Sequence, residues 1–246
     1  MVPLSIEKHN SSYPFLINYL EKHVNNERQW LLELAKQAMI DEGSADAAHD
    51  YDHVARVMAL ADTIQAPEGG DLLTIWAAVA FHDIGQAREH RDGGDHALIG
   101  AEIAADLLSG THFPQDAIPA VQQAIREHRI TGGVIPQTLE GRILYDADKI
   151  DCLGAIGIGR LYCITGRYNQ KVYSPVPAGI TEPIDPVIIR SLRRRPDYSP
   201  SIEFQLLFTN LPERMTTNTG RELARERFAY MQEFFTRLQQ EVAGEL

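Results

Sequence analysis

Apolar residues recur at intervals of three and four positions through most of this 246-residue chain. That spacing gathers them on one face of an α-helix, whereas a half-buried strand would need strict alternation. The segments VIPQ and SPVPAGI, which come nearest to strands, are short and contain proline, which cannot donate a hydrogen bond to a sheet. The sequence therefore predicts an all-α fold.

Six amphipathic or apolar segments before residue 170 are expected to form helices. They span residues 27–40, 51–65, 72–81, 96–108, 114–128 and 138–165, and residues 88–95 are expected to form a loop. The last helix contains Gly154, Gly157 and Gly159. Each glycine costs about 1 kcal/mol relative to alanine inside a helix. We therefore expect this helix to pass close to another.

The chain is expected to form a single domain over residues 1–246, with three parts after a polar N-terminal arm. A helical core occupies about residues 45–170, a proline-rich excursion follows at 171–200, and C-terminal helices occupy 201–244. The excursion holds six prolines and no helical period. A loop of that length in a compact domain is usually functional or disordered, and we expect this one to lie beside the site and to help select the substrate.

The charge balance limits the partners. With 23 basic and 34 acidic residues the net charge is −11, so we expect no nucleic-acid polymer as a partner, because a phosphate backbone needs clustered Lys and Arg. No apolar stretch reaches the ~18 residues of a membrane span, and the N-terminus has no pattern of a secretory signal. The two cysteines, Cys152 and Cys163, are expected as buried free thiols in one helix. A cytoplasmic protein is predicted.

Four polar residues occupy positions where these helices should face the core: His53, His82, Asp83 and Asp148. Singly, each has an ordinary explanation, such as a satisfied core histidine, a helix cap or an aspartate paired with arginine. Together they place two carboxylates in the core, at a cost of several kcal/mol each if unpaired. Helical geometry directs Arg142 and Lys149 elsewhere. A bound divalent metal would neutralise the two carboxylates. A set of nitrogen and oxygen ligands suits Mn²⁺, Fe²⁺, Co²⁺ or Mg²⁺.

The order His53, His82-Asp83, Asp148 matches the H…HD…D signature of the HD-domain metal-dependent phosphohydrolases. The strings AHDYDHVARV, AAVAFHDIG, AIREH and DADKIDCLGAIGIGR resemble the small stand-alone bacterial members, from about residue 45 to 166. This resemblance implies an HD-type helical bundle with a C-terminal helical extension, and it implies that the four residues are metal ligands. Asp148 is preferred to Asp146 because it shares the face of Leu144, and Asp151 is expected to orient a ligating histidine.

Some HD branches bind two ions through the pattern H, HD, H, H, D. Here that pattern adds His96 and His128 as candidate ligands of a second ion. An ordinary explanation stands beside each. His128 would end a helix, where the macrodipole favours a cation, and His96 would lie on the surface near a helix start.

The resemblance also implies an activity. We expect hydrolysis of phosphate esters or anhydrides of nucleotides or small phosphorylated metabolites, with Asp83 accepting a proton and with His128 and Lys149 assisting at the reacting phosphate. Two alternatives stay open: a dinuclear-iron oxygenase built on the six-ligand site, and a non-catalytic nucleotide-binding module. A homo-oligomer is compatible with the sequence.

Overall fold

The computed structural model describes residues 26–43, 51–129, 135–176, 192–193 and 195–246. Within these ranges every regular element is helical, so the all-α prediction is confirmed. In chain order the elements are α2 (Glu27–Glu42), α3 (Tyr51–Glu68), α4 (Leu72–Phe81), α5 (Gln86–Asp92), α6 (His96–Leu108), α7 (Ile118–Glu127), α8 (Leu139–Asp151), α9 (Gly154–Arg167), α11 (Pro200–Glu203), the π-helix η2 (Phe204–Phe208), the 3-10 helix η3 (Pro212–Arg214) and α12 (Asn218–Ala243).

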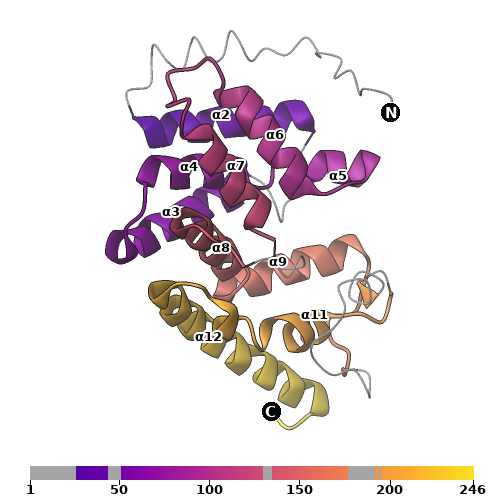
Figure 1. Cartoon of the computed structure of the whole chain (residues 1–246). Coiled ribbons are helices and arrows are strands. Elements are labelled where there is room, and N and C mark those ends of the chain that lie inside the picture. Colours follow the sequence, from indigo (N-terminus) through magenta and orange to yellow (C-terminus); the bar gives the residue numbers. More distant parts are fainter. Residues whose placement is uncertain (1–25, 44–50, 130–134, 177–191, 194) are drawn as a thin grey trace.

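Helix α4 lies at the centre of the N-terminal bundle (Figure 1). Its sequence LLTIWAAVAF is apolar nearly all round, and it packs against α2, α3, α6, α7 and α8. The side chain of Asp71 caps its first turn by accepting a hydrogen bond from the N–H of Thr74 at 2.8 Å. A helix that is surrounded in this way can deliver polar groups at its end, His82 and Asp83, into the interior.

Helix α8 lies between this bundle and the C-terminal helices (Figure 1). It contacts α3, α4 and α7 on one side and α9 and α12 on the other, and ten of its thirteen residues are buried. The buried residues include Asp146, Asp148, Lys149 and Asp151. The most enclosed helix of the C-terminal half is therefore also one of its most charged.

The prediction of one long helix over 138–165 is wrong. Helix α8 ends at Asp151, Cys152 caps it, and α9 begins at Gly154, whose φ of 72° suits glycine. A Cβ at Gly157 would lie 2.0 Å from the carbonyl oxygen of Cys152, so the turn between the helices requires glycine there. Around Gly159, by contrast, a Cβ would meet no atom within 4 Å, so the close approach expected at that glycine is not found.

Four other expectations also need correction. The segment 88–95, expected to be a loop, contains most of α5, and the helix expected from residue 114 begins at Ile118. The first of the C-terminal helices expected from residue 201 is a short α-helix followed by the π-helix η2. The two cysteines are neither both buried nor in one helix, because Cys152 is half-buried at the end of α8 and Cys163 is exposed on α9.

The two ends of the proline-rich excursion are anchored to one another. The N–H of Ser174 donates to Oγ of Ser199 at 3.0 Å, and Arg193 and Tyr198 both contact the buried carboxylate of Glu203. Residues 177–191, like the N-terminal arm 1–25, lie outside the described residues, and the excursion's expected effect on the substrate stays a prediction.

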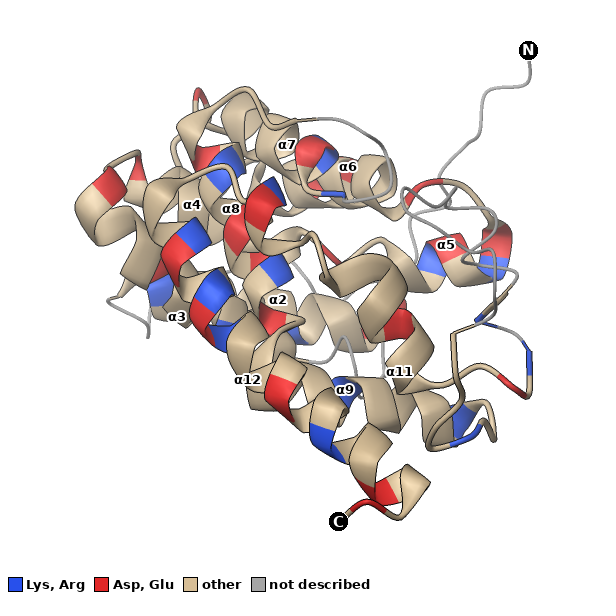
Figure 2. Cartoon of the chain, turned by 90° about the horizontal axis from the view of Figure 1, so that it is seen from below, with Lys and Arg blue, Asp and Glu red and all other residues tan. Residues whose placement is uncertain are grey.

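Acidic and basic segments are interspersed along α12 (Figure 2). Arg237 pairs with Glu241 on the same helix, and Arg225 pairs with Glu213 of η3. None of the described helices has both the length and the apolar composition needed to span a bilayer.

Candidate metal centre

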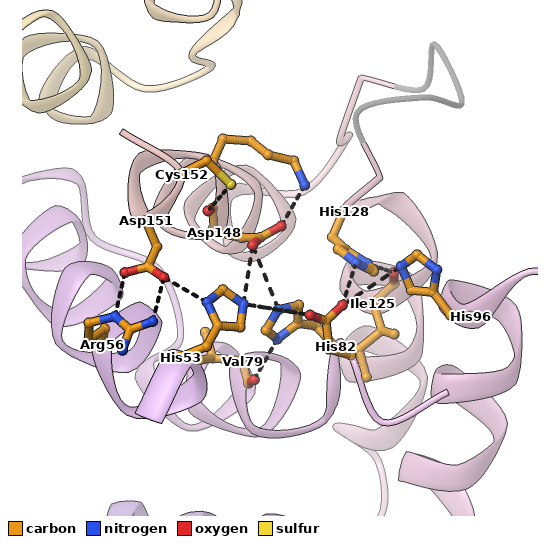
Figure 3. A network of polar contacts seen from close by, with 12 residues as sticks. His53, Arg56, Val79, His82, His96, Ile125, His128, Asp148, Asp151 and Cys152 are labelled. Atoms are coloured by element: carbon orange, nitrogen blue, oxygen red, sulfur yellow. Dashed lines mark hydrogen bonds and ion pairs between the residues drawn. The ribbon is translucent and has the colours of Figure 1, made fainter. Parts of the chain in front are cut away.

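Four histidines and two aspartates from five helical segments meet in one cluster (Figure 3). They come from the first turn of α3, the end of α4, the start of α6, the end of α7 and the last turn of α8. The six residues are His53, His82, Asp83, His96, His128 and Asp148. All are buried except His96, whose side chain is 13% exposed.

The inner trio consists of His53, His82 and Asp148. The Nε2 atoms of the two histidines lie 3.3 Å apart, and they lie 3.5 and 3.8 Å from Oδ1 of Asp148. The three donor atoms fall within 4.8 Å of one another, a spacing that could hold one metal ion.

The outer trio consists of Asp83, His96 and His128. The Nε2 atoms of both histidines lie 3.7 Å from Oδ1 of Asp83. The other oxygen of Asp83, Oδ2, lies 3.6 Å from Nε2 of His53 and 3.5 Å from Nε2 of His82. Asp83 therefore stands between the two trios and presents one oxygen to each.

Each histidine of the cluster is held by its outer ring nitrogen, Nδ1. The Nδ1 atoms of His82 and His128 lie 2.8 and 2.6 Å from the carbonyl oxygens of Val79 and Ile125. A carbonyl oxygen only accepts hydrogen bonds, so these two Nδ1 atoms carry the proton. When such a ring is neutral, its Nε2 is unprotonated and can bind a metal ion. The remaining Nδ1 contacts are those of His53 with Asp151 at 2.8 Å and of His96 with Glu89 at 2.7 Å. This arrangement is typical of ligating histidines, which donate their other N–H to a carbonyl or carboxylate.

Asp151, as expected, contacts a histidine of the cluster. Its Oδ2 receives Nδ1 of His53, while Arg56 donates to Oδ1 at 2.8 Å and Arg160 donates to Oδ2 at 3.0 Å. Although burial opposes ionisation, the hydrogen bonds from His53 and Arg56 and the charge of Arg160 lower the pKa of Asp151. Two arginines therefore hold the carboxylate that orients His53.

Asp148 also has a counter-charge, contrary to expectation. Nζ of Lys149 lies 2.5 Å from Oδ2 of Asp148, because the long side chain of the next residue folds back along the buried helix. Burial alone would raise the pKa of Asp148, but Lys149 and the two inner histidines hold that pKa well below its usual range. Oδ1 faces the inner trio and Oδ2 faces the lysine.

Burial and nearby carboxylates shift the pKa values of the histidines in different directions. Burial lowers the pKa of His82 to about 4 and also lowers the pKa of His96, so both rings are neutral and can ligate at pH 7. Burial acts on His53 in the same direction, but hydrogen bonds to Asp148, Asp151 and Asp83 outweigh it and raise the pKa of His53 well above its usual value. The three carboxylates around His53 therefore favour a positive charge at its ring.

The donor chemistry fits a divalent cation. Every donor atom is an imidazole nitrogen or a carboxylate oxygen, a set that suits Mn²⁺, Fe²⁺ or Co²⁺. Three donor atoms in each trio would leave positions on a bound ion open to other ligands. Among the described residues, the structure brings together all six of the side chains that the H, HD, H, H, D pattern names.

Asp146 points away from the cluster and contacts Thr216 and Thr217, so only Asp148 of this pair reaches the histidines. Glu89 was not predicted as a contact of His96, because residues 88–95 were expected to form a loop. The common contact of Arg56 and Arg160 with Asp151 could not be predicted either, since it depends on the break between α8 and α9.

Comparison with known proteins agrees with this geometry. The model of the HD domain family matches residues 50–153, which contain all six cluster residues. The uncharacterised protein YpgQ of Bacillus subtilis is 25% identical over 227 residues, which cover 91% of this chain and 95% of YpgQ.

Solved structures of bacterial proteins are similar over most of the chain. A predicted HD superfamily hydrolase from an uncultured Thermotogales bacterium is 29% identical with a TM-score of 0.59, covering 87% of this chain and 91% of that one. A Lactobacillus plantarum protein is 25% identical with a TM-score of 0.68, covering 87% and 97%. Residues 50–153 therefore match the HD domain, and the chain is similar over most of its length to a predicted HD superfamily hydrolase and to small stand-alone bacterial proteins such as YpgQ.

Proposed function

We propose that this protein is a divalent-metal-dependent phosphohydrolase that acts on nucleotides or other small phosphorylated metabolites. One observation carries the proposal: four imidazole rings, each held through Nδ1, direct Nε2 toward the two oxygens of Asp83. A buried cluster of this kind has no evident structural use without a cation, because it places two carboxylates and four imidazole rings together in the core.

The position of Asp83 supports two ions. His53, His82 and Asp148 would hold the first ion, His96 and His128 would hold the second, and Asp83 would contribute one oxygen to each. The two groups differ in charge. The first contains Asp148 in addition to the shared Asp83, whereas the second has only neutral imidazoles besides it. We infer that the first group binds its ion more tightly.

The chain's own groups suggest roles in the hydrolysis. When bound, a divalent ion would lower the pKa of a coordinated water and offset charge on a phosphoryl oxygen. Asp83, with an oxygen on each side of the cluster, would accept the proton of the attacking water. Lys149 uses one of its three N–H groups on Asp148 and can offer another to a phosphoryl oxygen. His128 would act as a ligand, or would donate a proton to the leaving group if only one ion is bound.

Two findings support a small phosphorylated substrate. First, B. subtilis YpgQ has been solved in complex with ADP, and that structure matches this chain with 24% identity and a TM-score of 0.63. Second, the cations beside the cluster are few and are individually placed: Lys149 on Asp148, Arg160 on Asp151, and Arg129 on Asp95 at 2.7 Å. Local cations of this kind suit a compact phosphate group better than an extended backbone.

The test is a phosphate-release screen on metal-free protein reloaded with Mn²⁺, Co²⁺, Mg²⁺ or Fe²⁺, over nucleotides and sugar phosphates. We expect turnover that EDTA abolishes. His82→Ala should be inactive, whereas His112→Ala, which removes a histidine that is remote from the cluster and paired with Glu27, should be fully active. Turnover that survives complete metal removal would refute the proposal.

The six-donor set also supports a second candidate, a dinuclear-iron oxygenase. Neutral imidazoles and a shared carboxylate are ligands that iron accepts as readily as Mn²⁺. Two bound irons with substrate-dependent O₂ consumption and no phosphate release would favour that reaction. A chain that binds nucleotide but turns over no substrate under either condition would be a binding module.

A further inference from the structure

The amino end of α12 is tied to the helix that carries Asp148. Asp146, two residues earlier on α8, is fully buried. Its Oδ1 accepts hydrogen bonds from the N–H and the hydroxyl of Thr216 at 2.8 and 3.0 Å, and its Oδ2 accepts from the N–H and the hydroxyl of Thr217 at 2.8 and 2.7 Å. Four donors therefore meet one carboxylate at a helix start, where the macrodipole favours an anion.

The first turn of α12 is built around this carboxylate. Thr217 is the N-cap of α12, and its Oγ accepts the N–H of Gly220 at 2.9 Å while the same hydroxyl donates to Asp146. A Cβ at Gly220 would lie 2.3 Å from Oδ2 of Asp146, so this close approach needs glycine. The cap of α12 and the anchor of α8 are one hydrogen-bonded unit.

A second tie lies further along the same two helices. Nη1 of Arg227, on α12, donates to the carbonyl oxygen of Ile150 at 3.1 Å. Helix α12 therefore holds α8 at residue 146 and at residue 150, one on either side of Asp148.

The geometry of α8 gives these contacts a consequence. Residues two apart on an α-helix point about 160° away from one another. Asp146 therefore fixes one side of α8 while Asp148 faces His53 and His82 on the other. Any rotation of α8 about its axis would move Oδ1 of Asp148 relative to these rings and would break the hydrogen bonds of Asp146.

We propose that Asp146 is a positioning residue for the metal centre. The clamp, which we define as Asp146, Thr216 and Thr217, sets the rotation of α8 and with it the place of Asp148 in the inner trio. This rests on the proposed role of Asp148 as a metal ligand. It also means that the metal centre depends on a helix outside residues 50–153, the part that matches the HD domain model.

Glu68 offers a matched control at the same helix end. Its Oε1 accepts the N–H and the hydroxyl of Thr219 at 2.8 and 2.9 Å, so it makes the same kind of contact with the first turn of α12. Glu68 is the last residue of α3, fifteen positions after His53, or about 22 Å along the helix. Its loss should weaken the attachment of α12 without turning α8.

The experiment is a Mn²⁺ titration of the metal-free full-length chain in wild type, Thr217→Val, Thr217→Ser and Glu68→Gln, with amide hydrogen exchange of α8 measured on the same samples. We expect Thr217→Val to bind Mn²⁺ about tenfold more weakly, as for other losses of groups that orient ligands, and to exchange faster in α8. Thr217→Ser, which keeps the hydroxyl, should restore both properties. Glu68→Gln should lower the melting temperature and leave Mn²⁺ affinity within about twofold of wild type.

The clamp would be refuted if Thr217→Val bound Mn²⁺ as tightly as wild type. It would also be refuted if Glu68→Gln lost as much Mn²⁺ affinity as Thr217→Val. If Thr217→Val does not fold, Thr216→Val carries the same comparison with Glu68→Gln, because it removes the 3.0 Å hydroxyl contact with Asp146, together with a 3.3 Å contact with the carbonyl oxygen of Arg142, and leaves the Thr217 cap in place. Asp148→Ala separates this inference from the proposed function. Unchanged Mn²⁺ binding in that variant would refute the metal centre itself, whereas loss of binding there with no effect of Thr217→Val would refute only the clamp.

Discussion

Nδ1 of His53 lies 2.8 Å from Oδ2 of Asp151, which is itself held by arginines from two different helices. The contact turns the ring of His53 so that Nε2 faces the cluster, and the negative charge makes that nitrogen a stronger donor. Asp151 therefore acts on the metal centre through His53, without reaching the centre itself.

Asp151→Asn should lower Mn²⁺ affinity by about 10- to 100-fold, because the amide can no longer offer His53 a charged acceptor and it leaves Arg56 and Arg160 without their common partner. Isothermal titration of the metal-free protein measures this. Asp62→Asn is the control, since Asp62 lies on α3, the helix of His53, and pairs with Arg28, but it does not contact the cluster. Equal affinities in the two variants would contradict the role given to Asp151.

Lys149→Met should lower kcat and spare metal content. The lysine contacts the outer oxygen of Asp148 and would offer another N–H to a phosphoryl oxygen, and the loss of such a donor typically costs about 10²- to 10³-fold in kcat. Bound Mn²⁺ should not fall, because a cation that competes for Asp148 has been removed. Lys149→Arg keeps the charge and should recover part of the rate. A variant that loses its metal with its activity would show that Lys149 is needed to build the site.

His96→Ala should remove one ion and leave the other. Its ring contributes to the outer trio only, and the inner trio has its own donors. Metal analysis of Mn²⁺-loaded protein should give two ions per chain in wild type and one in the variant. Glu89→Gln, which loosens Nδ1 of His96, should weaken only the second ion. A stoichiometry of one in both wild type and His96→Ala would show that the outer trio binds no ion.

The stability of the metal-free protein should depend on pH through His82. Burial lowers its pKa to about 4, so the unfolded chain takes up a proton on this ring between pH 6.5 and 4 while the folded chain does not. Stability is therefore lost as pH falls through that window, by up to about 3 kcal/mol for a pKa lowered from 6.5 to about 4. The raised pKa of His53 acts above pH 6.5, whereas the lowered pKa of His96 acts below it, in the same direction as that of His82.

Chemical unfolding of metal-free wild type and His82→Gln at pH 6.5 and pH 4 tests this, because the contributions of other groups are shared by the two proteins. Wild type should lose more stability than the variant on acidification. The same loss in both would show that His82 does not titrate in the predicted direction.

The fold class and the six cluster residues could be predicted from the sequence for a physical reason. Helical periodicity shows which positions face the core, and histidine or aspartate at such positions stands out because its burial is costly. His53 and Asp148 were recognisable in this way, and the resemblance to the HD signature added His96 and His128.

The partners of these residues could not be predicted, because they depend on contacts between elements. Glu89 reaches His96 only because residues 86–92 are helical, and Arg160 reaches Asp151 only because the chain turns after Asp151. Ideal helix geometry predicts that Lys149 points away from Asp148. In the structure, its flexible side chain folds back to this carboxylate. The anchoring of Asp146 by Thr216 and Thr217 joins residues about seventy positions apart, which periodicity does not register.

The most direct test of the metal centre is to add Mn²⁺ stepwise to the metal-free chain and to measure bound metal and phosphate release on the same samples. The substrate is the best one found in the phosphate-release screen. Phosphate release in wild type should rise with bound Mn²⁺ and level off when the cluster is filled, while Asp148→Ala should bind no ion in the inner trio and release no phosphate. Full phosphate release before any Mn²⁺ is bound, or wild-type binding and turnover in Asp148→Ala, would contradict the account.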